Sequence, residues 1–289
     1  MIESEWSACY REGMHRRAPS VLLVALAFAA CSSGSIALGR LDSDGSGADA
    51  GAPEAGVVDA DAVDAGTCLA PAPLHDWRFT GEGTSVPDLR GGSAATLRGG
   101  ATLDGTGLVR LDGLDDYVDL PNGLLAGLEE TSVVLWVRSQ GGPAYTRLLD
   151  IGTTSLGEDP APDASYVGRS YLVLTPGTGF VPSELAALTS NAGPPAEVVA
   201  PSAAEGDTEL HLVAVAFGVA SLSLFRDGLL LARVPRGFSL SEVVDDNAWL
   251  GRSQYAADPY QRADYASVRV FGRALDACEM AAFYREGAP

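Results

Sequence analysis

The segment TSVVLWVR, residues 131–138, decides the fold class of this chain. Side chains of a β-strand alternate between the two faces of a sheet, and here both alternating sets are apolar. One set is Val133, Leu135 and Val137, and the other is Val134 and Trp136. A strand of this kind is covered on both faces, which places it at the centre of a layered sheet rather than at an edge.

Further short apolar segments lie on both sides of this strand. They are rich in Val, Leu, Phe, Tyr and Trp, and Gly, Pro, Asp and Asn separate them. They predict strands at 74–79, 108–112, 117–121, 147–152, 170–175, 209–217, 221–234, 248–251 and 265–272. About 210 residues of short strands, without interposed helices to make parallel crossovers, predict an all-β fold with two antiparallel sheets packed as a sandwich.

Two local signals support this interpretation. Asp227-Gly228 lies between two apolar runs, and we expect a tight hairpin turn there rather than a metal ligand. Asp276 and Glu279 have the spacing of a capping box, and Gly287 can end a helix. The sequence therefore predicts a short C-terminal helix over 277–285, with Met280, Ala281 and Tyr284 on the face that packs on the sandwich.

Seven blocks of the sequence carry a resemblance to a known family. They are DGLDDYVDLP at 112–121, TSVVLWVR at 131–138, RLLDIG at 147–152, LHLVAVAF at 210–217, SLFRDGLLLARV at 223–234, WLGRS at 249–253 and the segment 265–284. In order and approximate spacing they resemble the laminin-G-like domains of the concanavalin A-like lectin and glucanase superfamily. The resemblance implies a two-sheet jelly roll over residues 67–289. It also implies a concave face and rim loops that bind carbohydrate or protein, sometimes with calcium, and a structural role for His211.

The N-terminal segment has a different character. An apolar run that ends in VALAFAACSSGS, residues 24–35, follows a basic lead and is too short to span a membrane. It predicts a signal peptide at 1–30, and its end resembles the lipobox of bacterial lipoproteins, in which Cys31 is lipidated. The alternative is an ordinary secretory signal with an incidental cysteine. Because three glutamates spoil the basic lead before Met14, we expect translation to begin at Met14.

Residues 31–66 form an acidic linker with almost no large apolar side chains. Such a segment cannot bury enough apolar surface to offset the entropy of ordering, so we expect it to be a disordered tether. The whole chain has a formal net charge of −19 and a pI of about 4.4. A chain of this charge repels phosphate backbones, which argues against nucleic acid as a partner.

Cys68 and Cys278 remain once Cys9 is placed before the expected start and Cys31 is lipidated. An exported protein keeps disulfides, and the resembling fold brings its first and last strands together. We therefore expect a disulfide between Cys68 and Cys278, with two free buried thiols as the alternative.

The sequence offers little for catalysis or for metal binding. A glycosidase of this superfamily carries Glu-x-Asp-x-Glu on a strand, which this chain lacks, and EVVDD at 242–246 is typical of a polar loop. Neither a zinc spacing nor a Gly-x-Ser-x-Gly elbow is present. Asp88, Asp115, Asp116 and Asp258 could supply calcium ligands. The resembling domains often have Gly-x-Ile-Asp before the last strand, where this chain has Ala263 and Ala266, so we expect no calcium at that site.

Residues 251–264, GRSQYAADPYQRAD, provide the candidate binding residues Tyr255, Asp258, Tyr260 and Gln261. Aromatic faces beside polar groups suit sugar rings, but the tyrosines could instead pack on the rim. The expected function is a lipid-anchored, non-enzymatic recognition module of the bacterial cell envelope, held in the outer membrane or at the cell surface, that binds polysaccharide or protein. The alternatives are a divergent glycoside hydrolase and a structural envelope protein without a small ligand.

Overall fold

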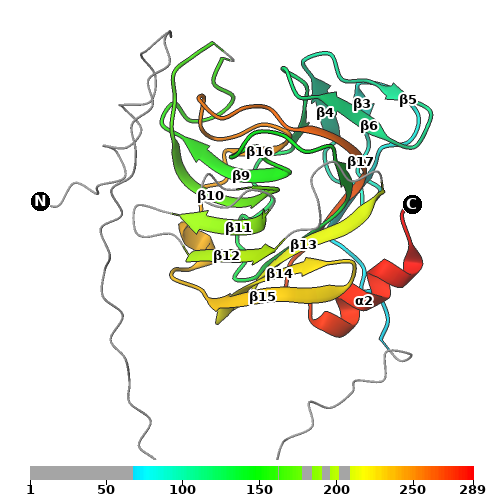
Figure 1. Cartoon of the computed structure of the whole chain (residues 1–289), viewed down its shortest axis with the longest axis vertical. Helices are drawn as coiled ribbons and strands as arrows, with labels where there is room; N and C mark the ends of the chain where they lie inside the picture. Colours follow the sequence, from blue (N-terminus) through cyan, green and yellow to red (C-terminus); the bar gives the residue numbers. More distant parts are fainter. Residues whose placement is uncertain (1–67, 162, 178–183, 191–195, 202–208) are drawn as a thin grey trace, which may run out of the picture. The chain divides into compact units, whose positions relative to one another are not determined.

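The computed structural model describes residues 68–161, 163–177, 184–190, 196–201 and 209–289, which form two antiparallel sheets and one helix, as predicted (Figure 1). The expected signal peptide at 1–30, the start at Met14, the lipidated Cys31 and the linker at 31–66 lie outside the described residues. In the part of the chain that the structure describes, no helix has the length and apolar character needed to cross a membrane.

Sheet A has nine strands and sheet B has eight. The spatial order of sheet A is β15 (Leu229–Pro235), β14 (Ser221–Arg226), β13 (His211–Phe217), β8 (Thr131–Ser139), β17 (Arg262–Phe271), β6 (Val109–Asp112), β5 (Leu103–Asp104) and β2 (Glu82–Gly83), and β1 (His75–Arg78) also pairs with β17. The order of sheet B is β12 (Ala196–Pro201), β11 (Glu184–Ser190), β10 (Gly168–Thr175), β9 (Leu149–Thr154), β16 (Asn247–Leu250), β7 (Tyr117–Leu120), β4 (Ala95–Arg98) and β3 (Ser85–Val86). A 3-10 turn, η1 (Leu240–Glu242), precedes β16.

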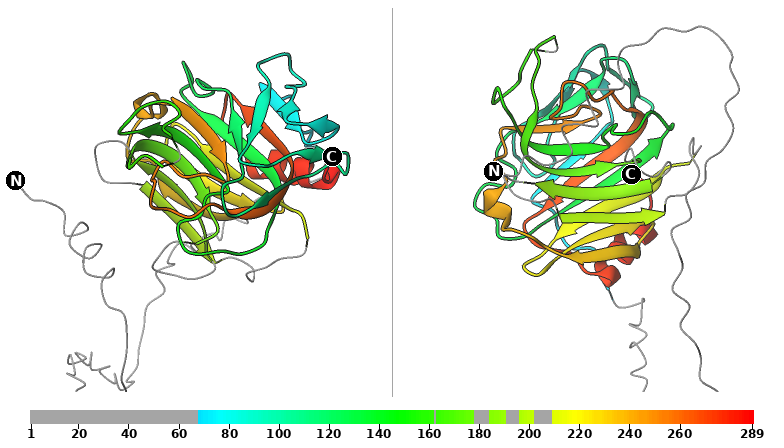
Figure 2. Two further views of the ribbon diagram at one scale, coloured as in Figure 1. Left: turned by 90° about the horizontal axis from the view of Figure 1, so that it is seen from above. Right: turned by 60° about the vertical axis from the view of Figure 1, so that its left-hand side comes forward.

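Strand β8 lies between β13 and β17 in the middle of sheet A, as its apolar pattern predicts. Val133, Leu135 and Val137 belong to the core cluster between the sheets. Val134 and Trp136 belong to a second cluster, which includes residues of the C-terminal helix. Both faces of the strand are therefore buried, and the sheet is covered from two sides (Figure 2).

Helix α2 (Ala277–Glu286) begins at the predicted capping box, in which the Asp276 carboxylate accepts a hydrogen bond from the Glu279 N–H at 2.9 Å. The buried helix residues are Met280, Ala282 and Phe283. The predicted packing face is confirmed for Met280, and Tyr284 also packs on the sandwich, because its ring stacks on Trp136 although the residue is 45% exposed. Ala281 is partly buried and lies against Gly228. Phe283, which was not predicted, is buried as well, and its ring packs on that of Phe271.

The disulfide between Cys68 and Cys278 is present, with the two Cα atoms 5.7 Å apart. It joins the first described residue to the first turn of α2. The tight turn between β14 and β15 is also confirmed, because Asp227 and Gly228 have φ of 52° and 78°.

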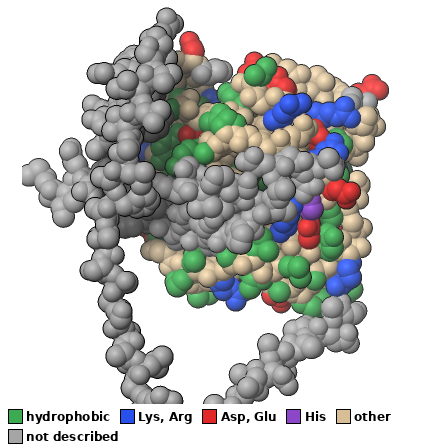
Figure 3. Space-filling model, in the orientation of Figure 1, with side chains coloured by type: hydrophobic (Ala, Val, Ile, Leu, Met, Phe, Trp, Pro, Cys, Tyr) green, Lys and Arg blue, Asp and Glu red, His purple; other side chains and the backbone are tan. Residues whose placement is uncertain are grey.

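The described surface carries charged side chains of both signs with hydrophobic side chains between them, as the space-filling view shows (Figure 3). Leu229 and Leu230, on the edge strand β15, are among the exposed hydrophobic residues. Exposed leucines are common on protein surfaces and do not by themselves indicate a binding site. A ligand site has to be identified from the arrangement of polar and aromatic side chains.

Candidate functional site

The outer face of sheet B carries the polar and aromatic side chains from which a site can be built. Val118 and Leu120 of β7 point into the core, so Tyr117 and Asp119 lie on the outer face. The same alternation in β16 places Trp249 outward. Helix α2 covers part of the outer face of sheet A, whereas the aromatic and polar side chains of β7 and β16 lie on the outer face of sheet B.

A row of side chains crosses this face. The strand register places Thr96 opposite Asp119, Asp119 opposite Trp249, and Trp249 opposite Asp150. Neighbouring strands lie about 4.8 Å apart, so the backbones of Asp119 and Asp150 are roughly 10 Å apart, with Trp249 between them. Sheet B therefore holds two carboxylates in one row, on either side of a tryptophan.

The loop after β16 covers the Asp150 end of the row. The Gln254 N–H donates to Asp150 Oδ2 at 3.0 Å, and Asn247 Nδ2 donates to Gln254 Oε1 at 3.2 Å. Asp150 is 1% exposed, and Gln254 is fully buried. Burial raises the pKa of Asp150 to about 7, while the nearby guanidinium of Arg147 opposes that rise. This end of the row is closed to solvent.

Asp258, predicted as a binding residue, holds this loop in place. Its Oδ2 accepts hydrogen bonds from Arg147 Nη2 at 2.8 Å and from Ser253 Oγ at 2.7 Å. Burial raises the pKa of Asp258, and Arg147 opposes the rise. The carboxylate is thus occupied by two partners of its own chain.

Tyr255 and Gln261 also pack within the protein. The Tyr255 ring lies edge-on to Tyr171 and against Gly168, where an added Cβ would come within 2.6 Å of the ring. Gln261 is fully buried, and its Nε2 donates to the carbonyl oxygens of Gly141 and Arg262 at 3.2 and 2.7 Å. Tyr260, the fourth predicted binding residue, is half-buried and lies beside Tyr117 on the outer face of sheet B.

Arg252 contacts three aromatic side chains near this face, those of Trp249, Tyr117 and Tyr166. Its guanidinium carbon lies 4.2 Å from the centre of the Trp249 ring and 4.9 Å from that of Tyr117. Nη1 donates to the Tyr117 hydroxyl at 3.0 Å, Nη2 donates to the Pro160 carbonyl at 2.7 Å, and Tyr166 accepts from Nε at 3.3 Å. Arg252 is 2% exposed, so it holds these rings in position without being accessible to a ligand.

We define the open patch as Arg98, Tyr117, Asp119, Asp159 and Tyr260. The rings of Tyr117 and Tyr260 are 6.3 Å apart and tilted by 45°, and both residues are half-buried. Arg98 donates from Nε and Nη2 to Asp119 Oδ2 at 3.2 and 3.0 Å, which leaves the other carboxylate oxygen of Asp119 to a ligand. Two rings beside fixed donors and acceptors form a surface of the kind that binds sugars.

The charges of the open patch influence one another. Burial and then the negative charge of Asp159 raise the pKa of Asp119, and Arg98 opposes this. Burial likewise raises the pKa of Tyr260, with the Arg252 charge opposing it and that of Asp115 adding to it. Carboxylates therefore surround the two rings, and the Arg98 guanidinium is bound to one of them.

Glycosidase carboxyl groups lie roughly 5 to 10 Å apart, and the backbones of Asp119 and Asp150 are roughly 10 Å apart on the same face. The burial of the pair does not suit that chemistry, because a sugar must reach both groups. Asp150 is 1% exposed, and the intervening Trp249 is fully buried. The predicted loop at 242–246 is not a catalytic strand either: Asp245 accepts hydrogen bonds from the N–H groups of Gly123 and Leu125.

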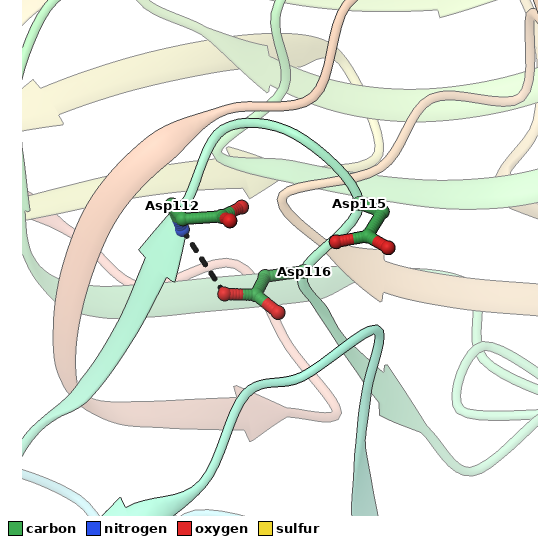
Figure 4. A group of neighbouring side chains, drawn as sticks. All are labelled: Asp112, Asp115 and Asp116. Atoms are coloured by element: carbon green, nitrogen blue, oxygen red, sulfur yellow. Dashed lines mark hydrogen bonds between the residues drawn. The ribbon is translucent and has the colours of Figure 1, made fainter.

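Asp112, Asp115 and Asp116 form a second group, in the turn between β6 and β7 (Figure 4). One carboxylate oxygen from each lies within 4.8 Å of the others, which is a spacing that a cation could bridge. Some of these oxygens already have partners, since Asp116 Oδ2 accepts from the Asp112 N–H at 3.2 Å and Asp112 Oδ1 from the Leu114 N–H at 2.8 Å. Burial raises the pKa of Asp116, and its two acidic neighbours add to the rise.

The other candidate calcium ligands have structural surroundings. Asp88 accepts hydrogen bonds from His75 Nδ1 and from the N–H groups of Asp76 and Arg90. Ala263 and Ala266, which stand where related domains often have a glycine and an aspartate, are both buried and have no side-chain oxygen. His211, the first residue of β13, bonds through Nδ1 to Asp227 in the β14–β15 turn at 2.7 Å.

A family model described as the concanavalin A-like lectin/glucanases superfamily, of the laminin G type, matches residues 112–281. This range holds more than half of the 289 residues and includes β7, β8, β9, β16 and β17. The chain belongs to this superfamily. No curated protein matches the chain.

Solved structures share the superfamily fold with this chain at low sequence identity. A mutant of Trypanosoma rangeli sialidase displaying trans-sialidase activity is 13% identical, with a TM-score of 0.53 over 75% of this chain and 33% of that chain. The receptor binding domain of botulinum neurotoxin mosaic serotype C/D is 14% identical, with a TM-score of 0.53 over 76% and 52%. Domain 4 of AbnA, an extracellular arabinanase from Geobacillus stearothermophilus solved with arabinotriose, is 16% identical, with a TM-score of 0.45 over 67% and 82%. This chain therefore spans about a third of the sialidase and about half of the toxin fragment, and the likeness is one of fold.

Sequence reasoning missed most of the open patch of this superfamily domain. Tyr117 and Asp119 were within reach, because residues two apart on a predicted strand share a face. Arg98 lies on β4, whose four residues ATLR carry a weak strand signal. Asp159 and Arg252 come from loops. Asp159 bonds to Asn247 of β16 and Arg252 bonds to Tyr117 of β7, and both contacts depend on how those loops fold.

Proposed function

We propose that this domain is a non-enzymatic carbohydrate-recognition module that a lipid on Cys31 holds at the bacterial cell envelope. The observation that carries the proposal is the open patch: the Tyr117 and Tyr260 rings lie side by side on the outer face of sheet B, with Asp119 and Arg98 beside them. A sugar ring can pack on such rings, while its hydroxyl groups bond to the fixed carboxylate and guanidinium. Membership of a superfamily of lectins and glucanases supports a glycan as the ligand.

The experiment is a glycan array with the purified protein, followed by calorimetry on any glycan that binds. Tyr260→Ala is expected to weaken binding about tenfold, a loss of about 1.4 kcal/mol. Tyr284→Ala, which removes an exposed tyrosine on α2, is the matched control and should bind like the unchanged protein. We expect binding to persist in a chelator. Unchanged affinity in Tyr260→Ala would show that the site lies elsewhere.

A divergent glycoside hydrolase is the second candidate, because Asp119 and Asp150 lie in one row on the same face. It predicts release of reducing sugar from a bound polysaccharide, and loss of that release in Asp150→Asn. The burial of Asp150 argues for the binding module instead. A structural envelope protein would bind no glycan and would co-purify with a protein partner.

The lipid anchor has its own test. Mass spectrometry of the mature protein should find a diacylglyceryl group on Cys31 at the new N-terminus, and Cys31→Ser should release the protein from the membrane fraction. A mature N-terminus at any other residue would contradict the anchor without affecting the glycan site.

A further inference from the structure

Carboxylates outnumber guanidinium groups in the open patch, which holds Asp119 and Asp159 beside Arg98. Asp159 is exposed at its edge, and its charge acts on Arg98, Tyr117 and Asp119. Asp115 acts on Tyr260 from the other side. A ligand that packs on the two rings therefore enters a region of negative potential.

Of the two guanidinium groups of this region, Arg252 is bound within the protein, and Arg98 is exposed but paired with a carboxylate. Arg98 directs Nε and Nη2 to one oxygen of Asp119. Arg252 is buried, and it donates to the hydroxyls of Tyr117 and Tyr166 and to the Pro160 carbonyl. An anionic sugar could reach the remaining N–H groups of Arg98, whose charge Asp119 already compensates, but it could not reach Arg252.

Asp159 is held in a defined position at this edge. Its N–H donates to Asn247 Oδ1 at 2.8 Å, and the following residue, Pro160, accepts from Arg252 at 2.7 Å. Its φ of 40° is in the left-handed region, which aspartate adopts more readily than most residues other than glycine. The fold thus holds an exposed carboxylate in the loop whose next residue bonds to Arg252, the partner of Tyr117.

We propose that the open patch selects glycans by charge, binding sugars with a free amino group more tightly than uncharged sugars and excluding sugars that carry carboxylate or sulfate. The inference rests on the proposed carbohydrate-recognition function. An ammonium group that bonds to Asp159 or to the free oxygen of Asp119 reduces the repulsion between these two negative charges.

The test compares three oligosaccharides by calorimetry with the purified protein. β-1,4-linked glucosamine oligomers and their N-acetylated counterparts share a backbone and differ in charge, and oligogalacturonate supplies the anionic case. At about pH 6, amines are cationic and carboxylates anionic. We expect the glucosamine oligomer to bind about fivefold more tightly than the acetylated one, and this difference to shrink as salt is added. We expect no measurable binding of oligogalacturonate.

Asp159→Asn should abolish the preference for the free amine, so that the glucosamine oligomer and the acetylated oligomer bind with equal affinity. Asp163→Asn removes an exposed carboxylate from the same loop and is the matched control, expected to keep the preference. Equal affinities for the two oligomers, or tightest binding of oligogalacturonate, would overturn the charge selection and leave the carbohydrate function standing. Failure of every glycan to bind, on the array and here, would overturn both proposals.

Discussion

Asp150 is a carboxylate that sheet B buries almost completely, and its charged form is costly there. Its Oδ1 has no hydrogen-bond partner among the described residues, although Oδ2 accepts from the Gln254 N–H. Arg147, the nearest cation, is 2.8 Å from Asp258 and 3.4 Å from Asp150. The pair with Asp258 is therefore the shorter of the two, and Asp150 keeps an incompletely compensated charge.

The raised pKa of Asp150 predicts a specific pH dependence of stability. The folded-state pKa of about 7 exceeds the ordinary value of 3.8, so the folded state binds the proton more tightly than the unfolded state. The stabilising contribution of the protonated carboxyl is complete below about pH 4 and is lost as the pH rises through about 7. Asp150→Asn should flatten this dependence and raise Tm at about pH 8 by roughly 2 to 4 °C.

Thermal melts between about pH 4 and pH 8 measure this effect, since the carboxyl titrates in that range. Asp163→Asn, in an exposed loop, is the control and should leave the pH profile unchanged. A lower Tm for Asp150→Asn at pH values above about 7 would mean that the ionised carboxylate stabilises the loop, contrary to this expectation.

Among the elements, the β14–β15 hairpin and helix α2 depend on each other. Gly228 in the turn has a φ of 78°, and a Cβ there would lie 2.8 Å from the Ala281 Cα in the helix. Gly127 has a similar φ of 75°, but a Cβ at that position would meet nothing within 4 Å. Comparing an alanine at each of the two positions therefore separates the cost of backbone strain, which both share, from the cost of contact with the helix, which occurs at Gly228 alone.

Gly228→Ala is expected to lower the free energy of unfolding by about 1 to 3 kcal/mol more than Gly127→Ala does, because it adds overpacking to a strain that both variants share. Urea unfolding followed by circular dichroism measures both losses. Equal losses would show that α2 moves away from the hairpin at little cost.

The sequence predicts the long elements of this fold well and the short ones poorly. Strands β8, β13 and β17 are each at least seven residues long and carry apolar side chains on both faces. Each of them overlaps a strand that the sequence predicts. β2, β3 and β5 have two residues each, too few to show a period of two. β11 and β12 were also missed, because ELAALTS and AEVVAP contain several alanines, which are uncommon in strands.

The candidate site was harder to predict than the fold for a physical reason. Tyr260 reaches the open patch, whereas Gln261, the next residue, turns inward and bonds to backbone carbonyl groups. Which side chain of an irregular loop faces outward depends on contacts with distant residues, and no local period reports it. Tyr117 and Asp119 lie two residues apart on a predicted strand and therefore share a face, which is the local signal that could have located the patch.

For the molecule as a whole, the disulfide between Cys68 and Cys278 closes a loop with a sequence separation of 210 residues. In the chain-entropy description, a loop of that size stabilises the folded state by up to about 5 kcal/mol. Double replacement by serine should therefore lower the urea midpoint markedly. Alkylation of the native protein without a reductant should modify neither thiol, and modification of both would contradict the bridge in solution.

The same bond determines how tension enters the molecule. A pull on the chain ahead of Cys68 is shared between the segment that leads to β1 and, through the two sulfur atoms, the first turn of α2. Strand β1 therefore cannot be peeled from β17 by that pull unless the helix is displaced as well. If this module holds a surface while its N-terminal segment is stretched, the ligand face on sheet B can keep its shape at forces that would begin to unravel an unbridged domain.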